Sequence, residues 1–207
     1  MGALARFDLP DLMRRFGVVH FVETGTGTGA SLGHAAGISP PFRSLHSCEI
    51  EEKLASDVSM KFIYEHRVHV STGKSLPFLL KVCNAVPANE PILFWLDAHF
   101  PGADYGMHGY GDESDDAVRL PLAQELAVIA WKRPQAPDVI ICDDLRIYAD
   151  GPFSSGNLPA DVRPYCPQRR DASFFEQIMG ATHDVRFLYD HEGYVIMTPK
   201  QGTPSDA

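Results

Sequence analysis

The sequence predicts an α/β fold: a doubly wound, mostly parallel, seven-stranded sheet that ends in an antiparallel hairpin. Apolar segments of strand length alternate with longer segments that can be helical. The strand-like segments are apolar at consecutive positions, which is typical of parallel sheets that helices cover on both faces. The last two are joined only by the tripeptide "HEG", which is too short for a crossover helix. We therefore expect one reversed strand near an edge of the sheet.

The predicted strands follow from short apolar runs that turn residues or acidic residues end. The first run leads directly into a glycine-rich turn, and the fourth, "PILFWLD", is apolar enough to lie in the centre of the sheet. The last two runs form the expected hairpin. In chain order the seven predicted strands are residues 17–23, 44–50, 66–71, 91–97, 138–144, 183–190 and 193–199.

Helices are expected between these strands, at residues 30–36, 51–63, 76–84 and 120–132. The last of them has Pro121 in its first turn and Pro134 just beyond its end, the two places where helices accept proline. The N-terminal segment 1–16 contains "LPDLMRRFG" and is expected to form a short helix that caps the sheet.

Two long stretches have no clear periodicity, residues 100–117 and 150–170. The first is rich in glycine and the second contains four prolines. Loops of this length inside a compact domain usually carry function. We expect both to lie on the side of the molecule where substrate binds.

Composition limits the classes of protein to consider. The 207 residues are enough for one sizeable domain, and we expect residues 1–207 to form a single one. The formal net charge of −9 disfavours a nucleic-acid partner. The four cysteines form no CxxC pair, and no apolar run approaches the length of a membrane span. These features predict a cytoplasmic protein with no membrane partner.

The stretch "VETGTGTGAS" at residues 22–31 joins a predicted strand to a predicted helix. Gly25, Gly27 and Ala30 satisfy the loose G-x-G-x-x-G/A pattern of nucleotide-binding turns. A dinucleotide would place its pyrophosphate near the carboxylate of Glu23, which is unfavourable. S-adenosylmethionine carries a sulfonium and an ammonium group, so Glu23 would favour it. The alternative is a strand–helix turn with no chemical role.

An acidic residue ends the second predicted strand in "SCEIEE". Glu49 lies about twenty residues beyond the glycine turn, where a carboxylate can accept hydrogen bonds from two ribose hydroxyls. Both a dinucleotide and S-adenosylmethionine would use such a residue. The alternative is a solvated acid at the end of a strand.

The motifs "VETGTGTGAS", "SCEIEE", "STGKS", "LDAHF" and "ICDD" together resemble the class I S-adenosylmethionine-dependent methyltransferases over about residues 16–200. Lys74 departs from the family pattern, because an acid that meets the adenine usually stands there. The contact with adenine is therefore expected from Ser75 or from the backbone. The resemblance implies cofactor contacts from Glu23, Gly25, Thr26, Gly27, Gly29, Ser31, Glu49, Ser75 and Asp97.

Three carboxylates follow neighbouring predicted strands: Asp97 after the fourth, and Asp143 and Asp144 after the fifth. The arrangement is similar to that of metal-dependent O-methyltransferases of the catechol and macrocin types, which implies a Mg²⁺ site at Asp97, Asp143 and Asp144. The separation of Asp97 from Asp143 is longer than in those families. The alternative is that Asp97 alone faces the cofactor and that the Asp pair caps a turn.

His99 lies two residues beyond Asp97, close to where a reacting hydroxyl would bind. Its imidazole can accept the proton as the methyl group is transferred, so His99 and Asp97 are the predicted catalytic residues. The alternative role for His99 is to support the loop. Tyr105, His108 and Tyr110 are weaker candidates for a substrate lid.

These observations predict Mg²⁺-assisted O-methylation of a small hydroxylated molecule from S-adenosylmethionine, by a chain that could form a homodimer. A metal-free N- or O-methyltransferase is the main alternative. A nicotinamide-dependent reductase is disfavoured by Glu23 and by the lack of a Tyr with a Lys four residues later. A non-catalytic nucleotide-binding protein would have no need of the acids at one edge of the sheet.

Overall fold

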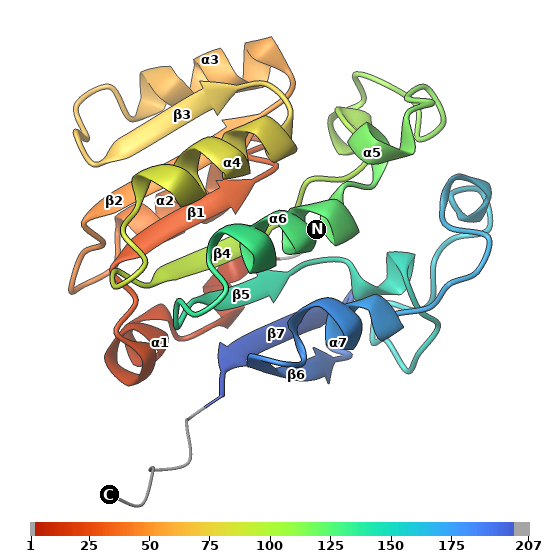
Figure 1. Cartoon of the computed structure of the whole chain (residues 1–207). Coiled ribbons are helices and arrows are strands. Elements are labelled where there is room, and N and C mark those ends of the chain that lie inside the picture. The colour runs from red at the N-terminus through yellow and green to blue at the C-terminus, as the bar shows by residue number, and fades with distance from the viewer. Residues whose placement is uncertain (1–2, 201–207) are drawn as a thin grey trace, which may run out of the picture.

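The structure is a computed structural model, and it describes residues 3–200. In these residues seven strands form one sheet in the order β3-β2-β1-β4-β5-β7-β6 (Figure 1). The chain therefore builds outward from β1 on one side and then crosses to start again at β4 on the other. The strands are β1 (His20–Thr24), β2 (Ser44–Glu49), β3 (Val68–Thr72), β4 (Ile92–Leu96), β5 (Val139–Cys142), β6 (His183–Leu188) and β7 (Tyr194–Pro199).

The strands β1 to β5 pair in parallel, whereas β7 pairs antiparallel with both β5 and β6. Only β7 runs against its neighbours in this sheet, and it lies next to the edge strand. This confirms the predicted α/β sheet with its C-terminal hairpin. Parallel pairing brings the carboxyl ends of β1 to β5 to one edge of the sheet, and the polar residues discussed below follow those ends.

Helices cover both faces of the sheet (Figure 1). One apolar cluster joins the sheet to α4, α6 and α7, and a second joins it to α1, α2 and α3. The helices are α1 (Leu9–Phe16), α2 (Ala30–Ala36), α3 (Glu52–Lys61), α4 (Ser75–Ala85), α5 (Asp116–Arg119), α6 (Leu122–Lys132) and α7 (Ser173–Met179). Short 3-10 turns are η1 (Leu4–Arg6), η2 (Ala103–Tyr105), η3 (Leu145–Ile147) and η4 (Arg163–Tyr165).

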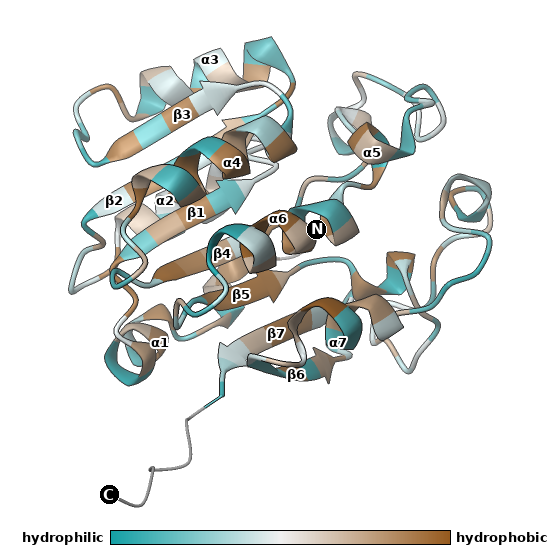
Figure 2. Cartoon of the chain, viewed as in Figure 1, coloured by the Kyte–Doolittle hydropathy of each residue, from teal (hydrophilic) through white to brown (hydrophobic). Residues whose placement is uncertain are grey.

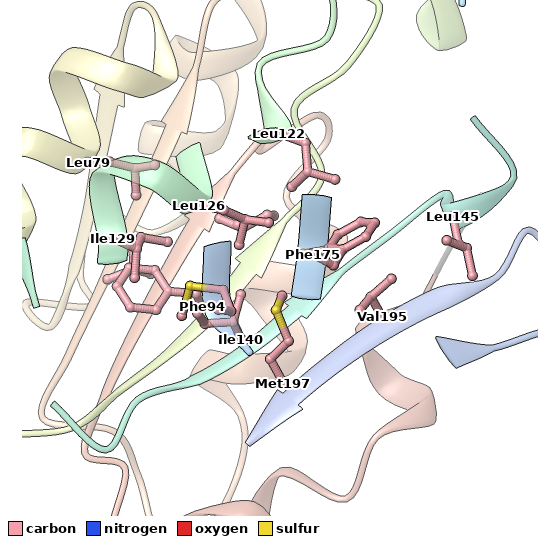
Figure 3. Packing of buried hydrophobic residues seen from close by; sticks show 14 of the residues in the cluster. Leu79, Phe94, Leu122, Leu126, Ile129, Ile140, Leu145, Phe175, Val195 and Met197 are labelled. Atoms are coloured by element: carbon pink, nitrogen blue, oxygen red, sulfur yellow. The ribbon is translucent and has the colours of Figure 1, made fainter. Parts of the chain in front are cut away.

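The core is continuous across the central strands. Figure 2 shows that β4 and β5 are hydrophobic along their lengths, as strands covered on both faces must be. In Figure 3, Phe94 of β4 and Ile140 of β5 lie beneath Leu126 and Ile129 of α6, and all four side chains are almost fully buried. Burial of such side chains contributes roughly 1.5–3 kcal/mol each, which fixes β4 and β5 relative to α6.

The structure differs from the helix predictions at the start of α6, and it contains two helices, α5 and α7, that were not predicted. The helix expected at 120–132 begins only at Leu122, because Leu120 precedes a proline and takes a non-helical conformation with φ −140° and ψ 68°. The helix α7 was not predicted, since seven residues are too few for a clear periodic signal. It forms because Phe175 and Met179, four residues apart, both bury against the sheet.

The N-terminal helix α1 (Leu9–Phe16) covers only part of the segment 1–16 in which a capping helix is expected. Asp8 caps its first turn by accepting a hydrogen bond from the backbone of Asp11, and Gly17 ends it in the left-handed conformation. Residues 1–2 lie outside the described part of the chain, as do residues 201–207 of the predicted domain. Within residues 3–200, none of the helices is long and apolar enough to span a membrane.

Candidate active site

A cavity of about 470 Å³ opens at the carboxyl ends of β1 to β5. Its wall includes residues at or within two positions of the end of each of these strands: Gly25, Glu49, Gly73, Asp97 and Asp144. Open α/β sheets bind ligands where the chain switches from one side of the sheet to the other, here between β1 and β4. The volume is that of a pocket for one small molecule or cofactor.

The glycine turn forms the floor of this cavity. The backbone amide of Gly25 donates to the carbonyl of Cys48 over 2.9 Å, which holds the turn against the end of β2. Gly25 has φ +80°, and a Cβ atom there would lie 2.5 Å from the carbonyl oxygen of Asp97. Only glycine allows this close approach of the β1 turn to the β4 loop.

Glu49 lies on the cavity wall beside the turn, as the sequence predicts. Its Oε2 atom accepts a hydrogen bond of 2.8 Å from the amide of Gly27, and its Oε1 atom accepts one of 2.9 Å from the amide of Glu51. The side chain is almost fully buried. The two backbone contacts fix the carboxylate in one orientation at the cavity edge.

Glu23 lies beneath the turn and does not line the cavity, so it is not placed for the predicted direct contact. Successive side chains of a strand point to opposite faces, and Glu23 points towards α2. Its carboxyl group accepts hydrogen bonds from the hydroxyls of Ser31 and, over 2.5 Å, of Ser47. Burial raises the pKa of Glu23 to about 7, although these hydroxyls oppose the shift. Ser31, in contrast, does line the cavity.

The opposite wall is built from Gly73, Lys74 and Ser75 at the start of α4. Lys74 is well exposed, and its Nζ lies 4.0 Å from Asp115. The sequence does not single out Glu125 of α6, because it looks like an ordinary polar residue of an amphipathic helix. It is fully buried, and burial raises its pKa to about 7 against the opposing effect of the Ser75 and Thr24 hydroxyls.

Asp97, His99 and Asp144 meet at the other end of the cavity. The Nε2 atom of His99 lies 2.9 Å from Oδ2 of Asp144, and its Nδ1 lies 3.6 Å from Oδ1 of Asp97. One ligand atom from each of these three residues lies within 4.8 Å of the others. We call Asp97, His99 and Asp144 the acidic trio.

The sequence predicts Asp97, Asp143 and Asp144 as the metal ligands. In the structure Asp143 is not part of the group, and His99 takes its place. The Oδ1 atom of Asp143 accepts the amide of Asp144, and its Oδ2 is buried without a hydrogen-bond partner among the described residues. The backbone of Asp144 explains why Asp144, and not Asp143, contacts His99. It has φ +53°, in the left-handed region, and this conformation directs the Asp144 side chain towards His99. No sequence signal distinguishes the two neighbouring acids.

Electrostatics in the acidic trio favour a protonated imidazole. Burial alone would lower the pKa of His99, but Asp144 and Asp97 outweigh it and raise the pKa to about 10. Burial and then Asp143 raise the pKa of Asp97 well above its ordinary value. Although burial opposes it, His99 lowers the pKa of Asp144. Positive charge is therefore strongly stabilised at this position.

The acidic trio also fits a divalent cation. Two carboxylates and one imidazole nitrogen, close enough to share one ion, are ligand types that protein-bound Mg²⁺, Mn²⁺ or Zn²⁺ accept. Asp143 lies beside this group, and burial and then Asp144 raise its pKa to about 7. A cation would relieve the repulsion between these acids.

The loop predicted at 100–117 folds over the cavity. Tyr105 lines the cavity and places its hydroxyl directly against Gly27, where any Cβ would clash with it. His108 pairs with Glu51 over 3.1 Å, and Tyr110 donates to Asp104 over 3.0 Å. In contrast, no described residue of the predicted loop 150–170 lines the cavity.

No family model and no curated protein matches this chain. Solved structures do. A Staphylococcus aureus protein provisionally named a caffeoyl-CoA O-methyltransferase has a TM-score of 0.61 and 16% identity, over 93% of this chain and 81% of its own. A methyltransferase from Podospora anserina, solved with S-adenosylhomocysteine, has a TM-score of 0.60 and 18% identity, over 95% and 84%.

The chain has the class I methyltransferase fold. A third structure agrees: an O-methyltransferase from Streptomyces achromogenes, solved with S-adenosylmethionine, has a TM-score of 0.56 and 16% identity, over 93% of this chain and 78% of its own. The methyltransferase fold accounts for the strand order and for the reversed β7. At these identities the similarity concerns the fold, so the activity must be argued from the site.

Proposed function

We propose that the protein is an S-adenosylmethionine-dependent O-methyltransferase that acts on a small hydroxylated molecule with the help of a divalent cation, in the first instance Mg²⁺. The supporting observation is one cavity with the glycine turn and Glu49 on one side and the acidic trio on the other. Two of the similar structures contain S-adenosylmethionine or S-adenosylhomocysteine, which supports the choice of cofactor.

The cofactor would lie across the glycine turn. Glu49 is already oriented by the amides of Gly27 and Glu51 and would accept hydrogen bonds from the ribose. Thr26 and Ser31 line the part of the cavity next to the turn, and Ser75 lines the opposite wall, where we place the adenine. The bound cofactor supplies the methyl group from its sulfonium.

The acceptor hydroxyl would lie next to the acidic trio. Asp97 and Asp144 would hold the cation through their carboxylates, and His99, whose pKa these acids raise, would then serve as the proton acceptor and not as a third ligand. Before a cation binds, Asp144 keeps the His99 ring in place through the 2.9 Å contact. The chain then contributes chiefly by positioning the hydroxyl oxygen in line with the methyl group.

A metal-free methyltransferase is the second candidate. The observation that favours it is the ion pairing within the acidic trio. A protonated His99 neutralises the charge of Asp144 over 2.9 Å and lies 3.6 Å from Asp97, so the acids have a counter-charge without a metal. Either candidate uses the same cofactor residues. A homodimer and a cytoplasmic location stay predictions.

Calorimetric titration of S-adenosylhomocysteine into the protein tests the proposed cofactor. We expect micromolar binding that Glu49→Gln weakens at least tenfold, because hydrogen bonds to a charged carboxylate contribute about 1.5–3 kcal/mol. Glu52→Gln, at an exposed position on α3 outside the cavity lining, is the matched control and should bind like the parent protein. Titrations with Mg²⁺ and then with a chelator separate the metal-assisted from the metal-free candidate. Absence of binding would contradict both.

A further inference from the structure

The lining of the cavity is strongly acidic. Lys74 is the one lysine or arginine among the lining residues, whereas the acids there are Glu49, Asp97, Asp104, Asp115 and Asp144. A divalent cation at the acidic trio would offset only part of this negative charge. Closely spaced charges of one sign in a cleft focus the field on any ligand that enters.

The rim of the cavity extends this charge to the surface. Residues 101–116 carry five acids and no lysine or arginine, and four of these acids are exposed. The acids of this segment are Asp104 and Asp115, which line the cavity, and Asp112, Glu113 and Asp116, which lie outside its lining. Part of this segment lines the cavity, and its Tyr105 lies against Gly27 of the glycine turn.

The basic residues around the site are already engaged by partners in the protein. Lys74 faces Asp115, Arg119 contacts Asp116 and donates to the carbonyl of Glu113 over 3.1 Å, and Arg146 lies 3.5 Å from Asp144. Phosphate groups are usually recognised by unpaired Arg or Lys side chains. Among the described residues that line the cavity, only Lys74 could supply such a contact, and Asp115 competes for it.

We infer that the acceptor is an uncharged or cationic hydroxylated molecule without phosphate groups, and not a coenzyme A ester or another polyanion. This inference rests on the proposed function, because it concerns the acceptor side of the same cavity. Each exposed rim carboxylate that faces a charged ligand at about 8 Å changes its affinity by roughly two- to threefold at low salt. Several such acids together should discriminate by more than tenfold between a cationic and an anionic ligand of the same shape.

Calorimetric titration tests the inferred charge preference. Three matched catechols and one polyanion are titrated into protein that is saturated with S-adenosylhomocysteine and Mg²⁺, and their affinities are compared. The catechols differ in charge only at the ring substituent: dopamine is cationic, 4-methylcatechol is neutral, and 3,4-dihydroxyphenylacetate is anionic. Caffeoyl-CoA is the polyanion. We expect dopamine to bind at least tenfold more tightly than the anionic catechol, no binding of caffeoyl-CoA, and a smaller difference in 0.5 M NaCl.

Asp104→Asn with Asp115→Asn should reduce the ratio of dopamine to dihydroxyphenylacetate affinity at least threefold. Asp57→Asn, on α3 and outside the cavity lining, should leave the ratio unchanged. Equal or tighter binding of the anionic catechol or of caffeoyl-CoA would overturn the inference, as would failure of every catechol to bind while S-adenosylhomocysteine binds. Failure of S-adenosylhomocysteine itself would instead overturn the proposed function.

Discussion

The Oε2 atom of Glu49 accepts a hydrogen bond of 2.8 Å from the backbone amide of Gly27. This contact joins the carboxyl end of β2 to the glycine turn that follows β1. The carboxylate is therefore oriented by the backbone before any ligand arrives, which would lower the entropic cost of binding the proposed ribose. Because the turn and Glu49 are joined by this hydrogen bond, a substitution in either should lower the affinity for the proposed cofactor.

Gly27→Ala should weaken S-adenosylhomocysteine binding at least tenfold and destabilise the fold by about 1–3 kcal/mol. Gly27 has φ +52°, and a Cβ atom there would overlap the hydroxyl of Tyr105. Gly106→Ala is the control for backbone strain, because Gly106 has φ +67° but nothing within 4 Å of its Cβ position. Calorimetry and thermal unfolding measure both effects. If the Gly27→Ala defect is not relieved by adding Tyr105→Ala, the steric explanation is wrong.

Glu23→Gln should become more stable relative to the parent protein as the pH rises from 5 to 7.5. Burial raises the pKa of Glu23 to about 7 in the folded protein, above the ordinary 4.5 of the unfolded chain. The folded state thus binds more protons in this window, and stability is lost as the pH rises from 4.5 through 7. The relative gain should be about 2–3 kcal/mol.

Urea unfolding of the parent protein and Glu23→Gln at pH 5, 6 and 7.5 measures this difference. Glu52→Gln, at an exposed position on α3, should show no comparable trend. A constant difference between Glu23→Gln and the parent protein at all three pH values would show that the carboxyl is ionised in the folded state.

Removing one carboxylate of the acidic trio should affect divalent cation binding, whereas removing the neighbouring acid should not. Asp97→Asn and Asp144→Asn should each weaken binding of Mn²⁺, used as a spectroscopic probe, at least tenfold. Asp143→Asn should change it by less than threefold, because Asp143 accepts the amide of Asp144 and is not one of the three possible ligands. Electron paramagnetic resonance of free Mn²⁺ gives the affinities. Equal losses for Asp143→Asn and Asp144→Asn would instead support the set predicted from the sequence.

Asp138→Asn should destabilise the protein by about 3–5 kcal/mol, because it leaves the buried charge of Arg133 without its partner. The two side chains are almost fully buried and paired twice, with Nε to Oδ2 at 2.7 Å and Nη2 to Oδ1 at 2.9 Å. Asp57→Asn breaks the exposed pair with Lys53 and should cost under about 1 kcal/mol. Urea unfolding at pH 7 compares them, and similar losses for the two variants would contradict the role of the buried pair.

The sheet was predictable because its signals are local. Each strand is an apolar run bounded by turn residues, and the polar residues Glu49 and Asp97 stand directly at strand ends, so parallel pairing alone brings them to one edge. The short helix α7 was not predictable, since Phe175 and Met179 reveal their spacing only against the sheet they cover.

The details of the site depended on geometry that the sequence does not encode locally. The left-handed backbone at Asp144 selects that residue over Asp143 for the contact with His99, and no pattern in "ICDD" indicates it. The sequence places Glu23 next to the glycine turn, as in the structure. It does not show that strand alternation directs the side chain towards Ser31 of α2 and away from the cavity. The buried carboxyl of Glu125 comes from a helix distant in sequence from the turn it faces.

A crystal structure of the protein soaked or grown with S-adenosylhomocysteine tests the central claim most directly. The account predicts the ligand at the carboxyl ends of β1 and β4, with its ribose hydroxyls on the carboxylate of Glu49 and its sulfur facing the acidic trio. A ligand bound elsewhere, or a ribose that avoids Glu49, would contradict it.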